Sequence, residues 1–349
     1  MIKKVYPPRL PEWLSNGGEG FEVVLSSEAL YIRNLEDRSF PGVLTEDERD
    51  ISRRQLVEAL SEILKGYRFW KTDILRDTQR GYLIERMSAP SELKSRPQGT
   101  GLFISGDEGS WVSLNTIDHL RFSVSVGGKD IETAYRSARQ LEEEFEQVLP
   151  FAYSERYGFL TSRPAECGTG LILSFLVHIP GVIFSNGFQK LRDSLLKSGC
   201  VLKPLEDEEI SSEGHIFIVH TVRSLGVDEE ELLETATDTV DHLSEMEFEA
   251  RDSLMSRARF QVEDKIMRGL GVLTHARMIA KQEGYALANA LRLGSCEGML
   301  QQTIDILSAT ELYLIGQPAH LEAVTSESTK AGLDRSRAEV FRSYLKYEE

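Results

Sequence analysis

The stretch Trp111–Phe122, WVSLNTIDHLRF, has the pattern of two β-strands joined by a short polar turn. Trp111–Asn115 and Leu120–Val126 combine β-branched and aromatic residues with alternating polar ones, which is typical of strands. Further segments of this type occur along the chain: Phe21–Ser26, Leu30–Asn34, Gly101–Ser105 and His215–Val222. Together these segments predict an antiparallel or mixed sheet.

The junction between the first two segments holds a dense group of polar side chains. Four of them fall within seven residues: Asn115, Asp118, His119 and Arg121. Thr116 and Ile117, in the middle of this group, can neither accept a proton at neutral pH nor carry charge. The group is therefore either an active site that has lost its central residues or a hydrogen-bonded turn that keeps the sheet in register.

Helical periodicity separates the β-type segments. Ile131–Leu149 and Asp228–Leu243 repeat apolar residues at intervals of about 3.6, which predicts amphipathic helices that cover the sheet. The longest apolar run, Leu171–Phe184, is predicted to form a buried helix. Because β-type signals end near residue 250, we predict an α+β fold, with an α/β domain at residues 1–250 and an all-α domain at residues 251–349.

Composition and charge narrow the classes of partner. The 349 residues carry a formal net charge of −16, which disfavours nonspecific binding to nucleic acid or anionic membranes. The first residues lack the apolar segment of a secretory signal, and the longest apolar run is too short to span a bilayer. Three cysteines without paired spacing, Cys167, Cys200 and Cys296, indicate a reducing compartment. We therefore expect a cytoplasmic protein that binds neither nucleic acid nor membranes.

Common nucleotide and metal motifs are weak in this chain. Gly127–Asp130 has a glycine-lysine pair, but its spacing is not that of a P-loop. His215 and His220 lie in a predicted strand at a spacing that should point their side chains to opposite faces, so we expect no metal site. Gly168–Gly170 precedes the predicted apolar helix and is a candidate anion site at a helix start; the alternative is a plain loop.

Five stretches between residues 20 and 345 carry more specific motifs. They are VVLSSEALYIRNL (Val23–Leu35), NTIDHLR (Asn115–Arg121), YGFLTSRPAECGTGLI (Tyr157–Ile172), VLKPLEDE (Val201–Glu208) and VEDKIMRGLGVLTHARMI (Val262–Ile279). In this order they resemble the phosphagen (guanidino) kinase family, specifically its bacterial protein arginine kinase branch, the McsB type. The resemblance implies a guanidino-kinase catalytic domain followed by the helical domain of that branch.

The reaction of this family makes strict demands on charge. Transfer of a γ-phosphoryl group from Mg-ATP to a guanidinium needs arginines that hold phosphate and a carboxylate that accepts the proton. By the resemblance, the phosphate-clamping arginines correspond to Glu28, Leu30 and Ile172, and a pair of glutamates corresponds to Thr116 and Ile117. At the first of these positions the arginine is absent and the carboxylate of Glu28 would also repel a polyphosphate. The resemblance therefore implies that no catalytic residue set is intact.

Other family positions keep a usable side chain. Arg121 is retained as arginine, Lys203 replaces another arginine, and Glu208 persists among the acids that contact the guanidinium. Arg163 stands at the position of a cysteine near the guanidinium, and Met87 at that of a histidine near the nucleotide. Arg121 and Lys203 are thus the residual phosphate contacts that the resemblance implies.

The resemblance also concerns the C-terminal helices. In protein arginine kinases this domain mediates dimerisation and carries the motif Arg-Asp-x-x-Arg-Ala, which binds phosphoarginine. The corresponding stretch here is LDRSRA (Leu333–Ala338), which retains Asp334 and Arg337 and has Leu333 in place of the first arginine. These two residues are a candidate phosphoarginine site, or else part of a solvated helix face. The partners implied are a second copy of the chain, a zinc-binding activator protein, the Clp protease machinery and phosphoarginine proteins.

Three hypotheses follow. The first is a catalytically inactive family member that acts by protein binding, for example in Clp-linked stress regulation, and that binds Mg-ATP only if residual nucleotide binding survives. The second is an active ATP-dependent protein arginine kinase that uses Mg-ATP in a rearranged site of Arg121, Arg163 and Lys203, with Glu208 or Asp118 as base. The third is an adaptor that recognises phosphoarginine on other proteins.

Overall fold

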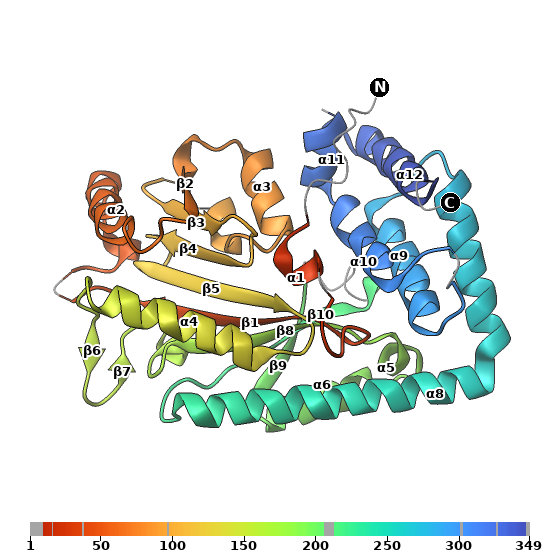
Figure 1. Ribbon diagram of the computed structural model, residues 1–349, viewed down its shortest axis with the longest axis horizontal. Helices are drawn as coiled ribbons and strands as arrows, with labels where there is room; N and C mark the ends of the chain where they lie inside the picture. The colour runs from red at the N-terminus through yellow and green to blue at the C-terminus, as the bar shows by residue number, and fades with distance from the viewer. Residues whose placement is uncertain are drawn as a thin grey trace.

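An antiparallel sheet of eight strands forms the centre of the computed structural model (Figure 1). The structure describes residues 10–15, 17–36, 38–95, 98–205, 213–300, 303–325 and 327–346. The strand order is β2-β3-β4-β5-β1-β8-β10-β9. The bounds of these strands are β1 Val24–Arg33, β2 Tyr67–Lys71, β3 Gly101–Ser105, β4 Ser110–Leu114, β5 Leu120–Gly127, β8 Leu171–His178, β9 Cys200–Pro204 and β10 Ile216–Thr221. A small second sheet pairs β6 (Tyr153–Ser154) with β7 (Gly158–Phe159), and the predicted α+β fold is confirmed.

Helices follow the strands in chain order. In the first part of the chain they are α1 Glu12–Ser15, α2 Glu46–Leu60, α3 Asp77–Glu85, α4 Ile131–Glu146, α5 Pro180–Phe184 and α6 Phe188–Lys197. Short 3-10 turns lie at Pro41–Val43, Thr72–Ile74, Ser91–Lys94 and Pro164–Glu166. The last part of the chain contributes α8 Glu229–His275, α9 Lys281–Cys296, α10 Ile306–Ile315, α11 Pro318–Thr325 and α12 Lys330–Lys346. No helix in these described ranges combines the length and the apolar character needed to cross a membrane.

Two predictions about the strands were wrong. The apolar run Leu171–Phe184 is not one helix: it forms β8 and then α5, which begins at Pro180. β8 lies between β1 and β10 and is buried on both sides, and a continuous apolar run cannot be told from a buried helix by periodicity. The segments predicted at Phe21–Ser26 and Leu30–Asn34 belong to one strand, β1, which continues through Glu28.

Alternation along the strands gives the sheet two different faces. One face packs against α4, α6 and the first half of α8, which lie on the same side of the sheet in Figure 1. It is built from apolar side chains such as Ala29, Tyr31, Phe122, Val124, Leu173 and Phe175. Because neighbouring residues point to opposite faces, Glu28, Leu30 and Arg121 lie on the other face. The candidate site is therefore on the face that these helices do not cover.

α8 connects the sheet to the C-terminal helices. Asp228 caps its start by accepting a hydrogen bond from the backbone N of Glu231 at 2.8 Å. The helix runs along the sheet and turns at Ala258, whose backbone is not helical (φ −139°, ψ 28°), toward α9, α10, α11 and α12 (Figure 1). The predicted helical character of the C-terminal part is confirmed. The predicted domain border after residue 250 falls inside α8 and stays a prediction.

A buried arginine joins the two parts of the molecule. Arg292 of α9 is fully buried, and its Nη1 donates to the carbonyl of Glu22 at 3.0 Å while its Nε donates to Oγ1 of Thr310 at 2.9 Å. Its Nη2 donates to the carbonyl of Phe21. The segment before β1 is thereby held against α9 and α10.

Candidate active site

The polar turn between β4 and β5 begins at Asn115, whose left-handed backbone (φ +54°) reverses the chain. Its backbone N donates to the carbonyl of His119 at 3.0 Å. Its side-chain amide donates to the carbonyl of Arg49 at 3.0 Å and accepts from Oγ of Ser52 at 3.1 Å. Asn115 therefore ties the turn to α2.

Asp118 and His119 are held by a shared asparagine. Oδ1 of Asp118 accepts hydrogen bonds from Nδ2 of Asn34 and from the backbone N of Ser162, both at 2.7 Å. Oδ1 of Asn34 in turn accepts from the backbone N of His119 at 2.9 Å. Burial lowers the pKa of His119 to about 4, so its imidazole is neutral at pH 7. These contacts support the interpretation of a turn that organises the sheet.

Thr116 and Ile117 occupy the centre of the turn without ionisable groups. Thr116 is 1% exposed, and its Oγ1 has no hydrogen-bond partner within the described part of the chain. The carbonyl of Ile117 accepts from Oγ of Ser162 at 2.7 Å. Neither side chain can take a proton from a guanidinium, which is the task that the resemblance assigns to a carboxylate here.

Arg121 lies among carboxylates. Its Nη1 is 3.5 Å from Oδ2 of Asp118, 3.6 Å from Oε2 of Glu166 and 3.9 Å from Oε1 of Glu92. The side chain is buried, and among the described residues this Nη1 forms no hydrogen bond. The positive charge of Arg121 is thus balanced by acidic side chains of the protein itself.

Arg163 and Lys203 lie beside the same carboxylates. Nη1 of Arg163 donates to Oε1 of Glu166 at 3.0 Å, and its Nη2 lies 3.5 Å from Oε1 of Glu92. Burial lowers the pKa of Lys203, and the positive charge of the nearby Arg163 acts in the same direction. The structure thus brings together the three predicted cations, and both arginines have carboxylates within 4 Å.

Sequence reasoning missed Glu92 and Glu166. Glu166 follows Arg163 by three residues, and this spacing in a short helical turn is a usable signal for an ion pair. Glu92 lies in the 3-10 turn Ser91–Lys94, far from the other site residues in sequence, and no local signal connects it to Arg121. Both carboxylates become visible only when the chain is folded.

The three positions that the resemblance assigns to lost arginines lie together on the uncovered face. Leu30 is paired with Ser123 of β5 on one side and with Ile172 of β8 on the other. Glu28, two residues earlier in β1, accepts a hydrogen bond from Oγ of Ser123. Burial raises the pKa of Glu28 above its ordinary value. This part of the face therefore presents an apolar pair and a half-buried acid.

Gly168–Gly170 is not an anion site at a helix start, because the following residues form β8. Gly168 and Gly170 have left-handed backbones (φ +109° and +60°). A Cβ at Gly170 would lie 2.6 Å from Nη1 of Arg33, a buried side chain that also donates to the carbonyl of Thr169 at 2.9 Å. The glycines are explained by this close packing.

The remaining predicted positions lie elsewhere. Glu208 falls outside the described residues. Met87 packs against the core of the C-terminal helices. Burial lowers the pKa of His215 to about 3 and that of His220 to about 4. In the described ranges no group of three His, Cys, Asp or Glu side chains is arranged to hold a metal ion.

Comparison with known proteins identifies the family of this fold and site. Residues 50–250, more than half of the chain, match the family described as ATP:guanido phosphotransferase, C-terminal catalytic domain. The chain belongs to this family. Residues 259–349 match the family described as protein-arginine kinase McsB C-terminal domain. The resemblance to guanidino kinases is thereby confirmed for both parts of the chain.

Relatives of this ATP:guanido phosphotransferase family member extend over nearly its whole length. The protein-arginine kinase of Symbiobacterium thermophilum is 31% identical over 342 residues, which cover 95% of this chain and 96% of that protein. The protein-arginine kinase of Syntrophomonas wolfei is 30% identical over 351 residues, covering 99% and 98%. That of Halothermothrix orenii is 27% identical over 347 residues, covering 99% of each.

Solved structures of two kinases share the fold of this ATP:guanido phosphotransferase family member. The duplicated taurocyamine kinase from Schistosoma mansoni, with bound transition-state analogue components, superposes with a TM-score of 0.60 at 20% identity. The match covers 68% of this chain and 34% of that one. A lombricine kinase superposes with a TM-score of 0.59 at 18% identity, covering 70% of this chain and 72% of that one. At these identities the likeness shows the fold alone.

Asp334 and Arg337, the predicted phosphoarginine site of this family member, contact each other in α12. Nη1 of Arg337 donates to Oδ1 of Asp334 at 2.9 Å and to the carbonyl of Ile279 at 2.7 Å. Its Nε donates to the carbonyl of Gly316 at 2.8 Å. Arg337 is 2% exposed, so it is not part of a solvated helix face. These bonds tie three segments of the C-terminal helices together, and phosphoarginine binding stays a prediction.

Proposed function

We propose that this member of the ATP:guanido phosphotransferase family has lost phosphoryl transfer and acts by binding other proteins. The proposal rests on the acidic side chains that surround Arg121. This arginine is the phosphate-clamp residue that the chain retains as arginine, and three carboxylates lie within 4 Å of its Nη1. A guanidinium so surrounded is a poor phosphate ligand, because a phosphate must compete with fixed negative charges.

The charge balance of the whole site supports the same conclusion. Arg121, Arg163 and Lys203 are matched by Glu92, Asp118 and Glu166, so the cluster carries no excess of positive charge. Glu28 lies on the same face of the sheet. Phosphoryl-transfer sites instead concentrate arginine, lysine and Mg²⁺ around the transferred group. The residues present therefore do not fit Mg-ATP in the arrangement that the structure has.

The side chains at the position of the general base also support the proposed loss of phosphoryl transfer. Thr116 and Ile117 cannot accept a proton, and Asp118 has one oxygen engaged by Asn34 and Ser162 and the other directed at Arg121. Loss of a general base costs a factor of about 10² to 10⁴ in rate. Loss of one transition-state charge contact costs about 10² to 10³. Together such losses should bring transfer to the background rate, although they need not be additive.

A transfer assay tests the proposal. The purified chain is incubated with radiolabelled Mg-ATP and casein as the arginine-containing acceptor, beside the protein-arginine kinase of Symbiobacterium thermophilum as a positive control. We expect acid-labile incorporation at the level of the reaction without protein. Reproducible incorporation by this chain that disappears in an Arg121→Ala variant would overturn the proposal.

A second candidate is an active protein arginine kinase with a rearranged site. The clustering of Arg121, Arg163 and Lys203 favours it, because arginine and lysine are the side chains that bind phosphate. Catalysis would then require Glu92 and Glu166 to move away from the arginines. Binding of Mg-ATP to the folded chain alone would raise its melting temperature, so absence of a shift at millimolar Mg-ATP removes this candidate.

The partners of an inactive family member are also part of the proposal. The family membership supports a homodimer in the cytoplasm that contacts a zinc-binding activator protein, the Clp protease machinery or proteins carrying phosphoarginine. Size-exclusion chromatography with light scattering checks the dimer: a mass of one chain at micromolar concentration would contradict it. Co-purification with a Clp ATPase checks the contact with the Clp machinery. The full chain is compared with variants in which surface charges are changed.

A further inference from the structure

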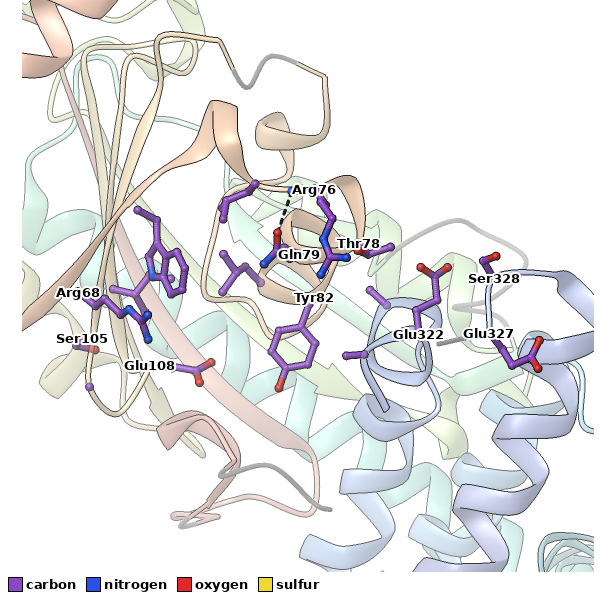
Figure 2. Close-up of a pocket in the computed structure, with 17 residues that line it drawn as sticks. Arg68, Arg76, Thr78, Gln79, Tyr82, Ser105, Glu108, Glu322, Glu327 and Ser328 are labelled. Carbon is purple, nitrogen blue, oxygen red and sulfur yellow. Dashed lines mark hydrogen bonds between the residues drawn. The ribbon is translucent and has the colours of Figure 1, made fainter. Parts of the chain in front are cut away.

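A cavity of about 820 Å³ opens between the sheet and the C-terminal helices (Figure 2). One wall is formed by β2, β3 and α3, and the other by α11 and the segment before α12. Arg121, Arg163 and Lys203 are not among its lining residues, so it is distinct from the candidate active site. Its volume is within the range of about 300–1,000 Å³ that ligand sites occupy.

The two walls carry opposite charges. Arg68 and Arg76 line the first wall, while Glu322 and Glu327 line the second, as Figure 2 shows. Within the described part of the chain, none of these four side chains has an oppositely charged group at ion-pair distance. The guanidinium of Arg68 stacks at 4.1 Å over the ring of Trp70 instead. Each wall therefore holds charge that the protein itself does not neutralise.

A third acid in the cavity differs from these. Oε2 of Glu108 accepts from Nε of Arg86 at 2.6 Å and from Oγ of Ser88 at 2.8 Å. Its Oε1 accepts from Nη2 of Arg86 at 2.9 Å. Glu108 is thus neutralised by a buried arginine, and the cations of its wall remain in excess. Between the charged groups the surface is lined by the aliphatic side chains of Leu75, Leu83 and Ile104. The aromatic rings of Trp70 and Tyr82 add flat contact area.

The distance between the walls is set by a contact at the base of α11. Glu85, the last residue of α3, accepts hydrogen bonds from the backbone N of Ala319 at 2.9 Å and of His320 at 3.1 Å. Nδ1 of His320 lies 2.8 Å from Oε2 of the same carboxylate. Because α3 and α11 are joined at this point, the groove is preformed.

We propose that this groove binds an extended segment of a partner protein that carries an acidic and a basic side chain on either side of an apolar one. The acidic group pairs with Arg68 and Arg76, the basic group with Glu322 and Glu327, and the apolar residue covers Leu83 and Tyr82. A polyphosphate would be repelled by the glutamates, and a purely cationic segment by the arginines. The proposal deepens the proposed function by giving protein binding a location.

Binding of short peptides to the full chain tests the groove. The probe is fluorescein-labelled Glu-Ala-Leu-Ala-Arg with an amidated C-terminus, measured by fluorescence polarisation in the absence of ATP. Control peptides of the same length carry two glutamates, two arginines or two glutamines in place of the Glu and the Arg of the probe. We expect the mixed peptide to bind tightest. No binding of the mixed peptide at millimolar protein, or equal binding of the glutamine peptide, would overturn the proposal.

Double variants locate the site. Arg68→Gln with Arg76→Gln, and separately Glu322→Gln with Glu327→Gln, should each weaken the mixed peptide by about tenfold, as the loss of two exposed charge contacts predicts. Arg136→Gln with Glu132→Gln, an exposed pair on α4, is the matched control and should have no effect. Unchanged affinity in both groove variants would overturn the proposal. Activity in the transfer assay would contradict the proposed loss of catalysis but would not contradict peptide binding in the groove. Failure of one proposal can therefore be distinguished from failure of the other.

Discussion

Leu30 of β1 and Ile172 of β8 lie directly opposite each other in the sheet. The Cβ atoms of such cross-strand partners are about 4.5–5.5 Å apart, so the two side chains are neighbours on the uncovered face. By the resemblance, both positions hold phosphate-clamping arginines in active relatives. Leu30 also packs against the apolar group that includes Trp111 and Ile104. In this chain the two positions therefore form an apolar contact where the resemblance implies a pair of charges.

Restoring the acids of the turn should not restore catalysis. A variant with Thr116→Glu and Ile117→Glu regains candidate bases, but Glu28, Leu30 and Ile172 still provide no phosphate clamp. We expect its transfer rate to stay at background, measured as acid-labile incorporation from radiolabelled ATP. A second variant adds arginine at Glu28, Leu30 and Ile172 and serves as the comparison. Transfer by the first variant alone would show that the clamp is dispensable.

Removing the carboxylates around Arg121 should create anion binding. In a Glu92→Gln, Glu166→Gln variant, two of the three carboxylates near Arg121 become neutral, while Asp118 remains at 3.5 Å. Arg163 loses both of its ion-pair partners, so pyrophosphate meets less repulsion. We expect pyrophosphate to raise the melting temperature of this variant and not that of the unmodified chain. The exposed Glu132→Gln change on α4 is the control. A shift of equal size in the unmodified chain would contradict the assignment of a neutralised site.

The stability of the protein should fall in acid partly through His119. Burial lowers the pKa of this imidazole to about 4 from an ordinary value of 6.5. Between these values the unfolded chain binds a proton that the folded chain does not, so the free energy of unfolding rises with pH across this window and is level above it for this group. The shift corresponds to about 3 kcal/mol.

His119→Gln checks this prediction. The glutamine cannot titrate, so urea midpoints measured between pH 4 and 7 should depend less on pH than those of the unmodified chain. His215 and His220 shift in the same direction, so part of the slope should remain. An unchanged slope would show that the pKa of His119 is the same in the folded and unfolded states.

Arg292→Ala should destabilise the junction between the two parts of the molecule. The change leaves the carbonyls of Phe21 and Glu22 and the hydroxyl of Thr310 without their buried donor. We expect a loss of about 3 kcal/mol, measured by urea unfolding, because unpaired buried polar groups are costly. Arg268→Ala, at a 77% exposed side chain of α8, should change stability by less than about 0.5 kcal/mol. Equal effects of the two changes would rule out a special contribution of Arg292.

Phosphoarginine binding at Asp334 and Arg337 can be measured by calorimetric titration with free phosphoarginine. If Arg337 binds the phosphate, Arg337→Ala should abolish the heat, and if the pair is structural only, no heat is expected in either protein. Because Arg337 also bonds to the carbonyls of Ile279 and Gly316, the variant must first show an unchanged circular dichroism spectrum. Equal binding heats in both folded proteins would exclude this site.

Several parts of the fold could be predicted from local sequence. The alternation in Leu120–Val126 and the amphipathic pattern from Ile131 onward are local signals, and both match elements of the structure, β5 and α4. β8 could not be predicted, because its side chains are buried on both faces of the sheet, so its apolar run lacks the alternation of a half-exposed strand. β2 and β9, the two edge strands of the sheet, were missed altogether.

The candidate site divides in the same way. Sequence by itself determined which charges are absent, since Leu30, Thr116, Ile117 and Ile172 cannot carry one in any fold. Only the tertiary structure decided what became of the charges that remain. Arg121 is balanced by Glu92 and Glu166 because turns distant in sequence bring these acids to within 4 Å, and Coulomb interactions depend on distance in space. The groove between α3 and α11 has the same origin. Its opposite charges lie about 250 residues apart in the chain and face each other because these two helices pack together, through Glu85 and through the rings of Tyr82 and His320.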